Sequence, residues 1–236
     1  VVKKWNAEHP NSATNPSLQD IEPLNISIKL TQCGLDQGFE FAEKNFREVL
    51  DVARGFNNFV RVDMEASEYT ERTMQMIGKV REDFKNTSTV LQSYLYRNDD
   101  DVETIIRWQA RVRLVKGAYL EPATVAYKEK SKVDEAYVRQ AKRLMDAAFY
   151  PALATQDEGI VNQLNQYAKE KGIRKDRFEY QMLYGIRRDL QDRLVAEGYN
   201  VRIYIPFGDS WYPYFTRRLA ERPANAFFIL RSLFKG

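Results

Sequence analysis

Three charged residues, Lys29, Asp63 and Arg113, occur inside strand-like segments in which polar and apolar residues alternate. Successive side chains of a strand point to opposite faces of a sheet, so each charge would lie on the face opposite the apolar residues. A buried ion without a partner is strongly destabilising. The three charges must therefore pair with each other or with a bound polar ligand, and they predict a functional site on the polar face. A plug of mutually paired charges that binds nothing is the competing interpretation.

The segments that must position these residues alternate between strand and helix patterns. Four of the strand-like segments, at 25–32, 59–65, 111–117 and 201–206, alternate polar and apolar residues. The predicted strands are Asn25–Gln32, Phe59–Glu65, Thr89–Leu95, Arg111–Gly117, Ala152–Gln156, Phe178–Leu183 and Val201–Pro206. The predicted helices are Phe39–Arg54, Thr70–Phe84, Asp134–Ala148, Gly159–Lys171, Arg188–Glu197 and a final helical region from Trp211 to Phe234 that is broken at Pro223.

This order predicts an α/β fold with a parallel sheet covered by helices. Seven strands behind a leading loop favour a (βα)8 TIM-type barrel that lacks its first strand in this chain, with a C-terminal helix over the barrel mouth. We expect one domain over 1–236, with a loop-like leader at 1–24 and the barrel at 25–236. A doubly wound nucleotide-binding sheet is the alternative, but Gly34 and Gly38 lack the third glycine of its usual turn.

Composition excludes several classes of function. The net charge of +3 comes from 36 basic and 33 acidic residues without a basic block, so no nucleic-acid partner is expected. His9 is the single histidine and Cys33 the single cysteine, so we predict neither a metal site nor an internal disulfide. No apolar run reaches the roughly 18 residues of a membrane span. We expect a cytoplasmic protein, or a mitochondrial one if its source is eukaryotic. The basic face at Arg139, Lys142 and Arg143 offers a transient contact with a membrane surface, although a solvated face is the commoner role.

Six phrases of the sequence resemble proline dehydrogenase, both the monofunctional bacterial type and the corresponding domain of bifunctional proline utilization A. They are ISIKLTQCGLD (26–36), FVRVDME (59–65), VLQSYLYR (90–97), RVRLVKGAYLEP (111–122), RFEYQMLYGIR (177–187) and VRIYIPFG with WYPYFTRRLAERPAN (201–225). The resemblance implies a (βα)8 barrel that holds FAD non-covalently and oxidises L-proline to Δ1-pyrroline-5-carboxylate. It also implies a membrane quinone as electron acceptor and a downstream pyrroline-5-carboxylate dehydrogenase as a partner.

The resemblance also assigns a substrate site. Arg217 and Arg218 would lie about 100° apart on a helix and offer guanidinium forks to the proline carboxylate, with Glu221 orienting them. We expect an ion pair between Lys29 and Asp63. Tyr204 would wall the proline ring and crowd a ring hydroxyl, which favours proline over hydroxyproline. The predicted substrate residues are Lys29, Asp63, Ala118, Tyr119, Leu183, Tyr204, Tyr214, Arg217, Arg218 and Glu221.

A flavin needs hydrogen bonds along its polar edge, and charged groups near N5 tune its chemistry. Gly117 would let the backbone approach the flavin ring closely. Gln156 stands where the family has histidine, so we expect a weaker flavin contact or a changed potential. The predicted cofactor residues are Gln92, Arg113, Val115, Lys116, Gly117, Thr155, Gln156, Asp157, Gln181, Arg218 and Glu221.

Two alternatives to the flavoenzyme remain open at the level of the sequence. The first is a Schiff-base lyase or aldolase that uses Lys116 or Lys29. Lys116 shares the alternation of the outward-facing Val112 and Leu114, which counts against it unless the strand has ended before it. The second alternative is a non-catalytic, incomplete barrel.

Overall fold

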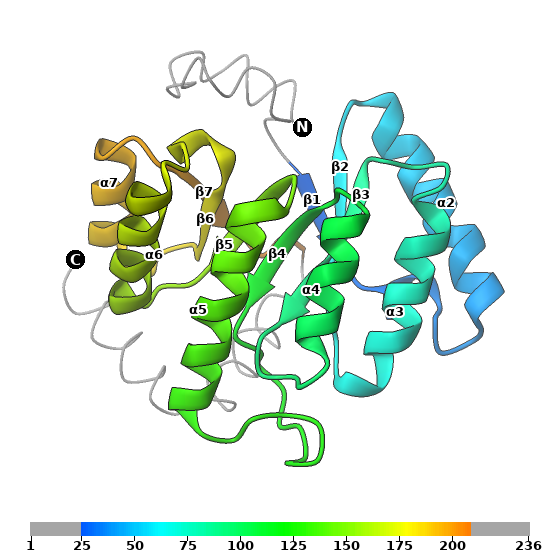
Figure 1. Cartoon of the computed structure of the whole chain (residues 1–236). Helices are drawn as coiled ribbons and strands as arrows, with labels where there is room; N and C mark the ends of the chain where they lie inside the picture. The colour runs from blue at the N-terminus through cyan, green and yellow to red at the C-terminus, as the bar shows by residue number, and fades with distance from the viewer. Residues whose placement is uncertain (1–24, 209–236) are drawn as a thin grey trace.

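The computed structural model describes residues 25–208, and they form one parallel sheet surrounded by helices (Figure 1). The predicted leader and the predicted C-terminal helix lie outside the described residues. The strands follow each other through the sheet in chain order, each paired with the next in parallel, as predicted. They are β1 (Asn25–Ile28), β2 (Phe59–Val62), β3 (Thr87–Gln92), β4 (Arg111–Val115), β5 (Tyr150–Ala154), β6 (Glu179–Leu183) and β7 (Asn200–Tyr204).

A helix follows each of the first six strands, and these helices lie around the outside of the curled sheet in chain order (Figure 1). They are α2 (Phe39–Gly55), α3 (Ser67–Val80), α4 (Asn98–Arg107), α5 (Lys130–Ala147), α6 (Glu158–Lys171) and α7 (Arg188–Ala196), with short 3-10 turns η2 (Leu30–Cys33) and η3 (Lys175–Arg177). In residues 25–208, no helix is both long enough and apolar enough to cross a membrane.

Helix α4 is missing from the prediction because its beginning carries no apolar residue. Asp99, Asp100 and Asp101 fill its first turn, where carboxylates are favoured by the partial positive charge of a helix start. The buried apolar stripe that would have revealed the helix consists of Val102 and Ile105, which are only two residues. The run of acidic residues was the signal in the sequence that could have revealed the start of this helix.

The outer face of the sheet packs against the helices and forms the main hydrophobic core. Val112 and Leu114 of β4 have no exposed surface and pack with Tyr137 and Leu144 of α5. The same core continues through Leu153, Tyr180 and Met182 to Val161 and Leu164 of α6. The predicted apolar set therefore faces outward, as the alternation required.

The inner face of the sheet carries the polar set. Arg113 of β4 contacts Ser27 of β1 and Gln181 of β6, which it can reach only across the barrel interior. Arg61 of β2 is 2% exposed and Glu179 of β6 is 3% exposed. The interior is polar, in contrast to the branched aliphatic filling of an ordinary barrel.

The basic residues of α5 are largely engaged within the fold. Arg139 pairs with Asp99 and Arg143 pairs with Glu103, and both carboxylates belong to α4. The ammonium of Lys142 lies 4.9 Å from the centre of the Tyr167 ring. These contacts join neighbouring helices, so the predicted membrane-facing patch is not a set of free charges.

The assignment of the two faces predicts the response to truncation of an outward-facing strand residue. We expect Leu114→Ala to lower the free energy of unfolding by about 2–5 kcal/mol, because it opens a cavity in the outer core. Urea denaturation measures this change.

The matched control is Leu120→Ala, at a leucine that is 93% exposed. We expect it to change the free energy of unfolding by less than about 0.5 kcal/mol. Equal losses for the two variants would contradict the assignment of the faces.

Candidate functional site

The carboxyl ends of parallel strands meet at one edge of a sheet, which is where barrel enzymes place their active sites. Ten of the predicted site residues lie at or close to this edge. They belong to all seven strands or follow them closely, so the topology brings together positions that are far apart in the chain. These residues are Lys29, Asp63, Gln92, Val115, Lys116, Gly117, Thr155, Gln181, Leu183 and Tyr204.

The centre of the site is an ion pair between Arg113 and Asp63. The Nη1 of Arg113 lies 2.6 Å from Oδ1 of Asp63, and the two side chains are 8% and 22% exposed. The hydroxyl of Tyr204 donates to the other carboxylate oxygen at 3.0 Å. The guanidinium carbon of Arg113 also lies 5.1 Å from the centre of the Tyr204 ring. The Asp63 carboxylate thus fixes the positions of both the Arg113 guanidinium and the Tyr204 ring.

The predicted ion pair between Lys29 and Asp63 is wrong. The Nζ of Lys29 lies 3.5 Å from the hydroxyl of Tyr119, and the Asp63 carboxylate is taken by Arg113 and Tyr204. The reason is local. Strand β1 ends at Ile28, and Lys29 directly precedes the turn η2 as its N-cap, with its backbone N–H donating to the side chain of Gln32 at 2.8 Å. The side chain of Lys29 therefore contacts Tyr119 in the loop after β4 and does not contact Asp63.

Lys116 lies one residue beyond the end of β4, so the strand alternation does not apply to it. Its ammonium is 2.5 Å from Asp134 of α5 and 3.1 Å from Asp157. Burial alone would raise the pKa of both carboxyls, but the ammonium groups of Lys116 and Lys130 act against burial and both pKa values are lowered. Asp157 also caps α6 by accepting from the backbone of Gly159 at 3.1 Å. The cap fixes the position of Asp157 beside Lys116.

Gly117 has a φ of +112°, a conformation that side chains with a Cβ rarely adopt. A Cβ at this position would also lie 2.4 Å from the ring of Tyr94. The close approach that requires glycine is therefore made to Tyr94. Ala118 is exposed and Tyr119 half-buried in the same loop.

Glu121 anchors this loop to the start of α3. It is 7% exposed and accepts from the backbone N–H of Ser67 at 2.7 Å, at the start of α3. The hydroxyl of Ser67 donates to its second oxygen at 2.5 Å. Glu121 thus fixes the loop two residues after Tyr119, whose hydroxyl contacts Lys29 just past the end of β1.

Three glutamines supply neutral polar groups along the edge. The amide of Gln92 donates to the carbonyl of Glu65 at 2.8 Å, and Gln181 accepts from Arg113. The Oε1 of Gln156 is buried and has no hydrogen-bond partner among the described residues. Gln156 directly precedes Asp157, an ion-pair partner of Lys116. An orphaned acceptor and a nearby ammonium group fit a ligand that combines hydrogen-bond donors with anionic groups. FAD is such a ligand, because it carries ribityl hydroxyls, a ring N–H and a pyrophosphate.

Deeper in the barrel, the structure adds three charged residues that we did not predict as part of the site. They are Arg61, Glu179 and Arg202, and the Nε of Arg202 lies 2.9 Å from Glu179. Burial, and then the charge of Arg113, lowers the pKa of Arg61 to about 9. Arg61 and Arg202 stand in the polar alternation of their strands, so that pattern was a sufficient signal for both. Tyr214, Arg217, Arg218 and Glu221 lie outside the described residues.

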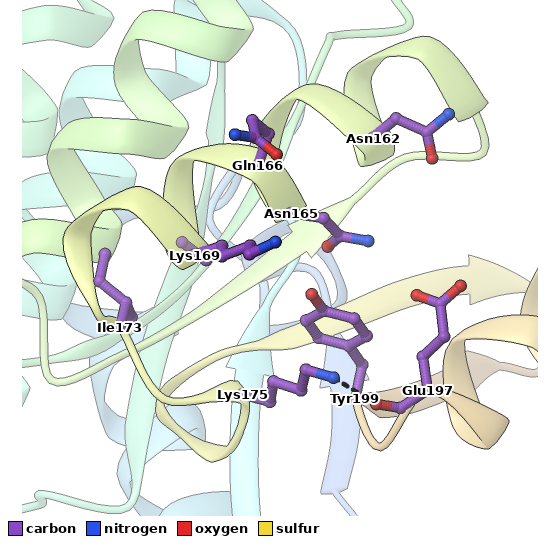
Figure 2. A pocket seen from close by; sticks show the side chains of 9 residues that line it. Asn162, Asn165, Gln166, Lys169, Ile173, Lys175, Glu197 and Tyr199 are labelled. Atoms are coloured by element: carbon purple, nitrogen blue, oxygen red, sulfur yellow. Dashed lines mark hydrogen bonds between the residues drawn. The ribbon is translucent and has the colours of Figure 1, made fainter.

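A separate pocket of about 350 Å³ lies between α6, η3 and the start of β7 (Figure 2). Lys175 donates to the carbonyl of Glu197 there at 2.5 Å, and Tyr199 lies beside them. Strand β7 begins at Asn200, so this pocket is near the amino ends of the strands, and the site lies at their carboxyl ends. We assign the chemistry to the strand edge, where the buried charges converge.

Comparisons with known proteins identify relatives of this chain. A family model described as proline dehydrogenase matches residues 2–231. The chain is 41% identical over 210 residues to proline dehydrogenase 2 of Bacillus subtilis (strain 168), which covers 89% of this chain and 69% of that protein. It is 43% identical over 216 residues to proline dehydrogenase of Deinococcus radiodurans, with 89% and 70% covered.

Two solved structures of proline utilization A have the same fold. The protein from Bdellovibrio bacteriovorus matches with a TM-score of 0.79 and 25% identity over 92% of this chain. The protein from Bradyrhizobium japonicum matches with a TM-score of 0.77 and 22% identity over 93% of this chain. The chain spans only 27% and 26% of those longer proteins. The TIM-type barrel is thereby confirmed, and the extent of the family match shows that the chain belongs to the proline dehydrogenase family.

Proposed function

We propose that this chain oxidises L-proline to Δ1-pyrroline-5-carboxylate with FAD as the cofactor, as the first step of proline catabolism. The reaction removes two electrons and two protons from the ring C–N bond of proline. FAD, when bound, supplies the electron acceptor. The observation that carries the proposal is the Asp63–Arg113–Tyr204 arrangement at the strand ends of a chain of this family.

The described residues favour a small anionic substrate with an apolar ring. Lys29 is half-buried, and Tyr119 is the hydrogen-bond partner of its ammonium. That ammonium would attract a carboxylate, and Tyr204 and Leu183 at the same edge would contact the ring. We further propose that Arg217 and Arg218 complete the carboxylate site, with Tyr214 and Glu221 beside them. The hydroxyl of Tyr204 is held by Asp63. The tyrosine would therefore crowd a hydroxyl group on the substrate ring, which favours proline over hydroxyproline.

The cofactor would lie along the edge from β3 to β6. Gln92, Gln181 and Arg113 would contact its ring system, and Lys116 would face its pyrophosphate. Val115, Gly117, Thr155 and Asp157 would line the same stretch, with Arg218 and Glu221 completing it. A cation near the ring would stabilise the negative charge that develops there on reduction.

No side chain of the described site is placed as a dedicated base. Asp63 is held by Arg113 and Tyr204, and both aspartates near Lys116 are held as its counterions. We propose that proline binds with its amine deprotonated, so that hydride loss needs no protein base. The chain's contribution is then to orient the substrate carbon toward the flavin and to exclude water from it.

We also propose a membrane quinone as the final electron acceptor and a pyrroline-5-carboxylate dehydrogenase as the enzyme that consumes the product. The protein would then be cytoplasmic and peripheral at the inner face of the membrane. The ion pairs of α5 make that helix a poor candidate for the membrane contact.

The proposal predicts a yellow protein that is bleached by L-proline. Anaerobic addition of L-proline should remove the visible flavin absorption, and hydroxyproline should remove it more slowly. A stopped-flow absorbance record measures both rates. A colourless protein in which borohydride traps a covalent adduct between a lysine and a carbonyl compound would indicate a Schiff-base lyase instead. A colourless protein without an adduct would exclude both activities for this chain.

Replacement of Lys29 tests the substrate site. We expect Lys29→Met to raise KM for L-proline about 10–100-fold with a smaller effect on kcat, because a hydrogen bond to a charged group contributes about 1.5–3 kcal/mol. Steady-state kinetics with a soluble acceptor measures this change. Lys44→Met, at an exposed position of α2, is the matched control and should leave KM unchanged. An unchanged KM in Lys29→Met would remove Lys29 from the substrate site.

Replacement of Gln156 tests the cofactor site. We expect Gln156→His to tighten FAD binding by roughly 5-fold, the equivalent of about one hydrogen bond, because it restores the residue typical of the family. Titration of the cofactor-free protein with FAD measures the dissociation constant. Gln163→His, at an exposed position of α6, is the control. If Gln156→His alters neither affinity nor rate, the interpretation of this substitution is wrong.

A further inference from the structure

A continuous chain of hydrogen bonds crosses the barrel interior beneath the proposed flavin site. It begins at Arg202, whose Nε donates to Glu179 at 2.9 Å. Glu179 accepts from the side-chain amide of Gln181, and the amide oxygen of Gln181 accepts from Nε of Arg113. Arg113 then binds Asp63, which accepts from Tyr204. The chain links the deep interior to the residues at the strand ends.

Glu179 determines the direction of this chain. A glutamine side chain has a donor end and an acceptor end. Because Glu179 takes the donor end of Gln181, the acceptor end must face Arg113. A reversed amide would place two donors against each other at Arg113. The orientation of Gln181 therefore follows from the carboxylate below it.

The surroundings of Glu179 consist of hydrogen-bond donors and positive charge. Arg202 contacts both of its oxygens, at 2.9 and 3.1 Å, and the Tyr150 hydroxyl lies 3.4 Å from one of them. Tyr150 in turn accepts from Asn200 at 3.0 Å. Burial alone would raise the pKa of Glu179, but Arg202 and then Gln181 reverse the shift and the pKa is lowered. The group remains a carboxylate in the interior.

We infer that Glu179 is a positioning residue, which orients Gln181 and, through it, Arg113. The inference rests on the proposed function for its meaning, since Gln181 and Arg113 are the proposed flavin contacts. Glu179 itself lies one layer below them and touches neither substrate nor cofactor in this arrangement. Glu179 would thereby determine which hydrogen-bonding groups of Gln181 and Arg113 face the flavin.

The test is Glu179→Gln in the full chain. A glutamine has one acceptor oxygen in place of two, so it cannot accept from both Arg202 and Gln181 in the same way. We expect FAD affinity to fall about tenfold, in line with the loss of one hydrogen bond to a charged group. We also expect a shifted flavin absorption band and a lower kcat, with KM for proline changed less than twofold.

A second measurement works without FAD. In cofactor-free protein labelled with [15N]glutamine, the side-chain NH2 signals of Gln181 report its hydrogen-bond partners. Assignment comes from their loss in Gln181→Glu. We expect Glu179→Gln to move these signals. The double variant Glu179→Gln with Gln181→Glu restores the order of donors and acceptors, and it should recover most of the loss in thermal unfolding midpoint.

The matched control is Glu43→Gln. Glu43 is also buried and binds two basic residues, Arg47 and Lys79, but it lies on α2 outside the barrel. It should lower thermal stability without altering FAD affinity or the Gln181 signals. Unchanged Gln181 signals in Glu179→Gln would overturn the inference, and so would FAD affinity within twofold of the unaltered chain. If the unaltered chain binds no FAD, the proposed function fails, and the Gln181 signals still decide the positioning role.

Discussion

The constraint on which the rest of this structure depends is the burial of charge inside a sheet that is apolar on its other face. Arg113 is 7% exposed, and an unpaired guanidinium at that depth would be strongly destabilising. It is tolerated because Asp63, Gln181 and Ser27 take its donors from three other places in the sheet. The ion pair therefore requires the sheet to curl, and the curled sheet in turn holds the ion pair in a fixed geometry.

A polar interior is tolerated because the hydrophobic core lies elsewhere, between the helices and the outer face of the sheet. The two larger clusters of buried apolar residues lie between the strands and helices α2 to α7, outside the sheet. Because apolar packing outside the sheet stabilises the fold, the barrel interior does not need an apolar filling. It can hold a network of hydrogen bonds instead, and such networks are specific when every member is satisfied. Arg61 is one exception, because its Nε and Nη1 have no partner among residues 25–208.

Much of this arrangement was predictable from the sequence, because strand alternation and parallel topology are both short-range patterns. They gave the seven strands, the two faces and the inward direction of Arg113. What they could not give was the end of each strand. Lys29 and Lys116 both lie just past a strand end, and their partners depend on where the chain turns. The network beneath the site was also missed as a unit, since which inward residues meet depends on the curvature of the sheet. Helix α4 was missed because its polar start hides a short apolar stripe.

The sequential order of the strands has a consequence for how the protein folds. Every strand pairs with its neighbour in the chain, so each β-α unit can form with contacts that are local in sequence. The hydrogen bond between Tyr204 and Asp63 is different, because it joins residues 141 positions apart. Its formation must overcome the closure entropy of most of the described chain unless the intervening units have already formed. Assembly of the polar interior would then be a late event in folding, and the chain would acquire its chemistry only when the curled sheet is complete.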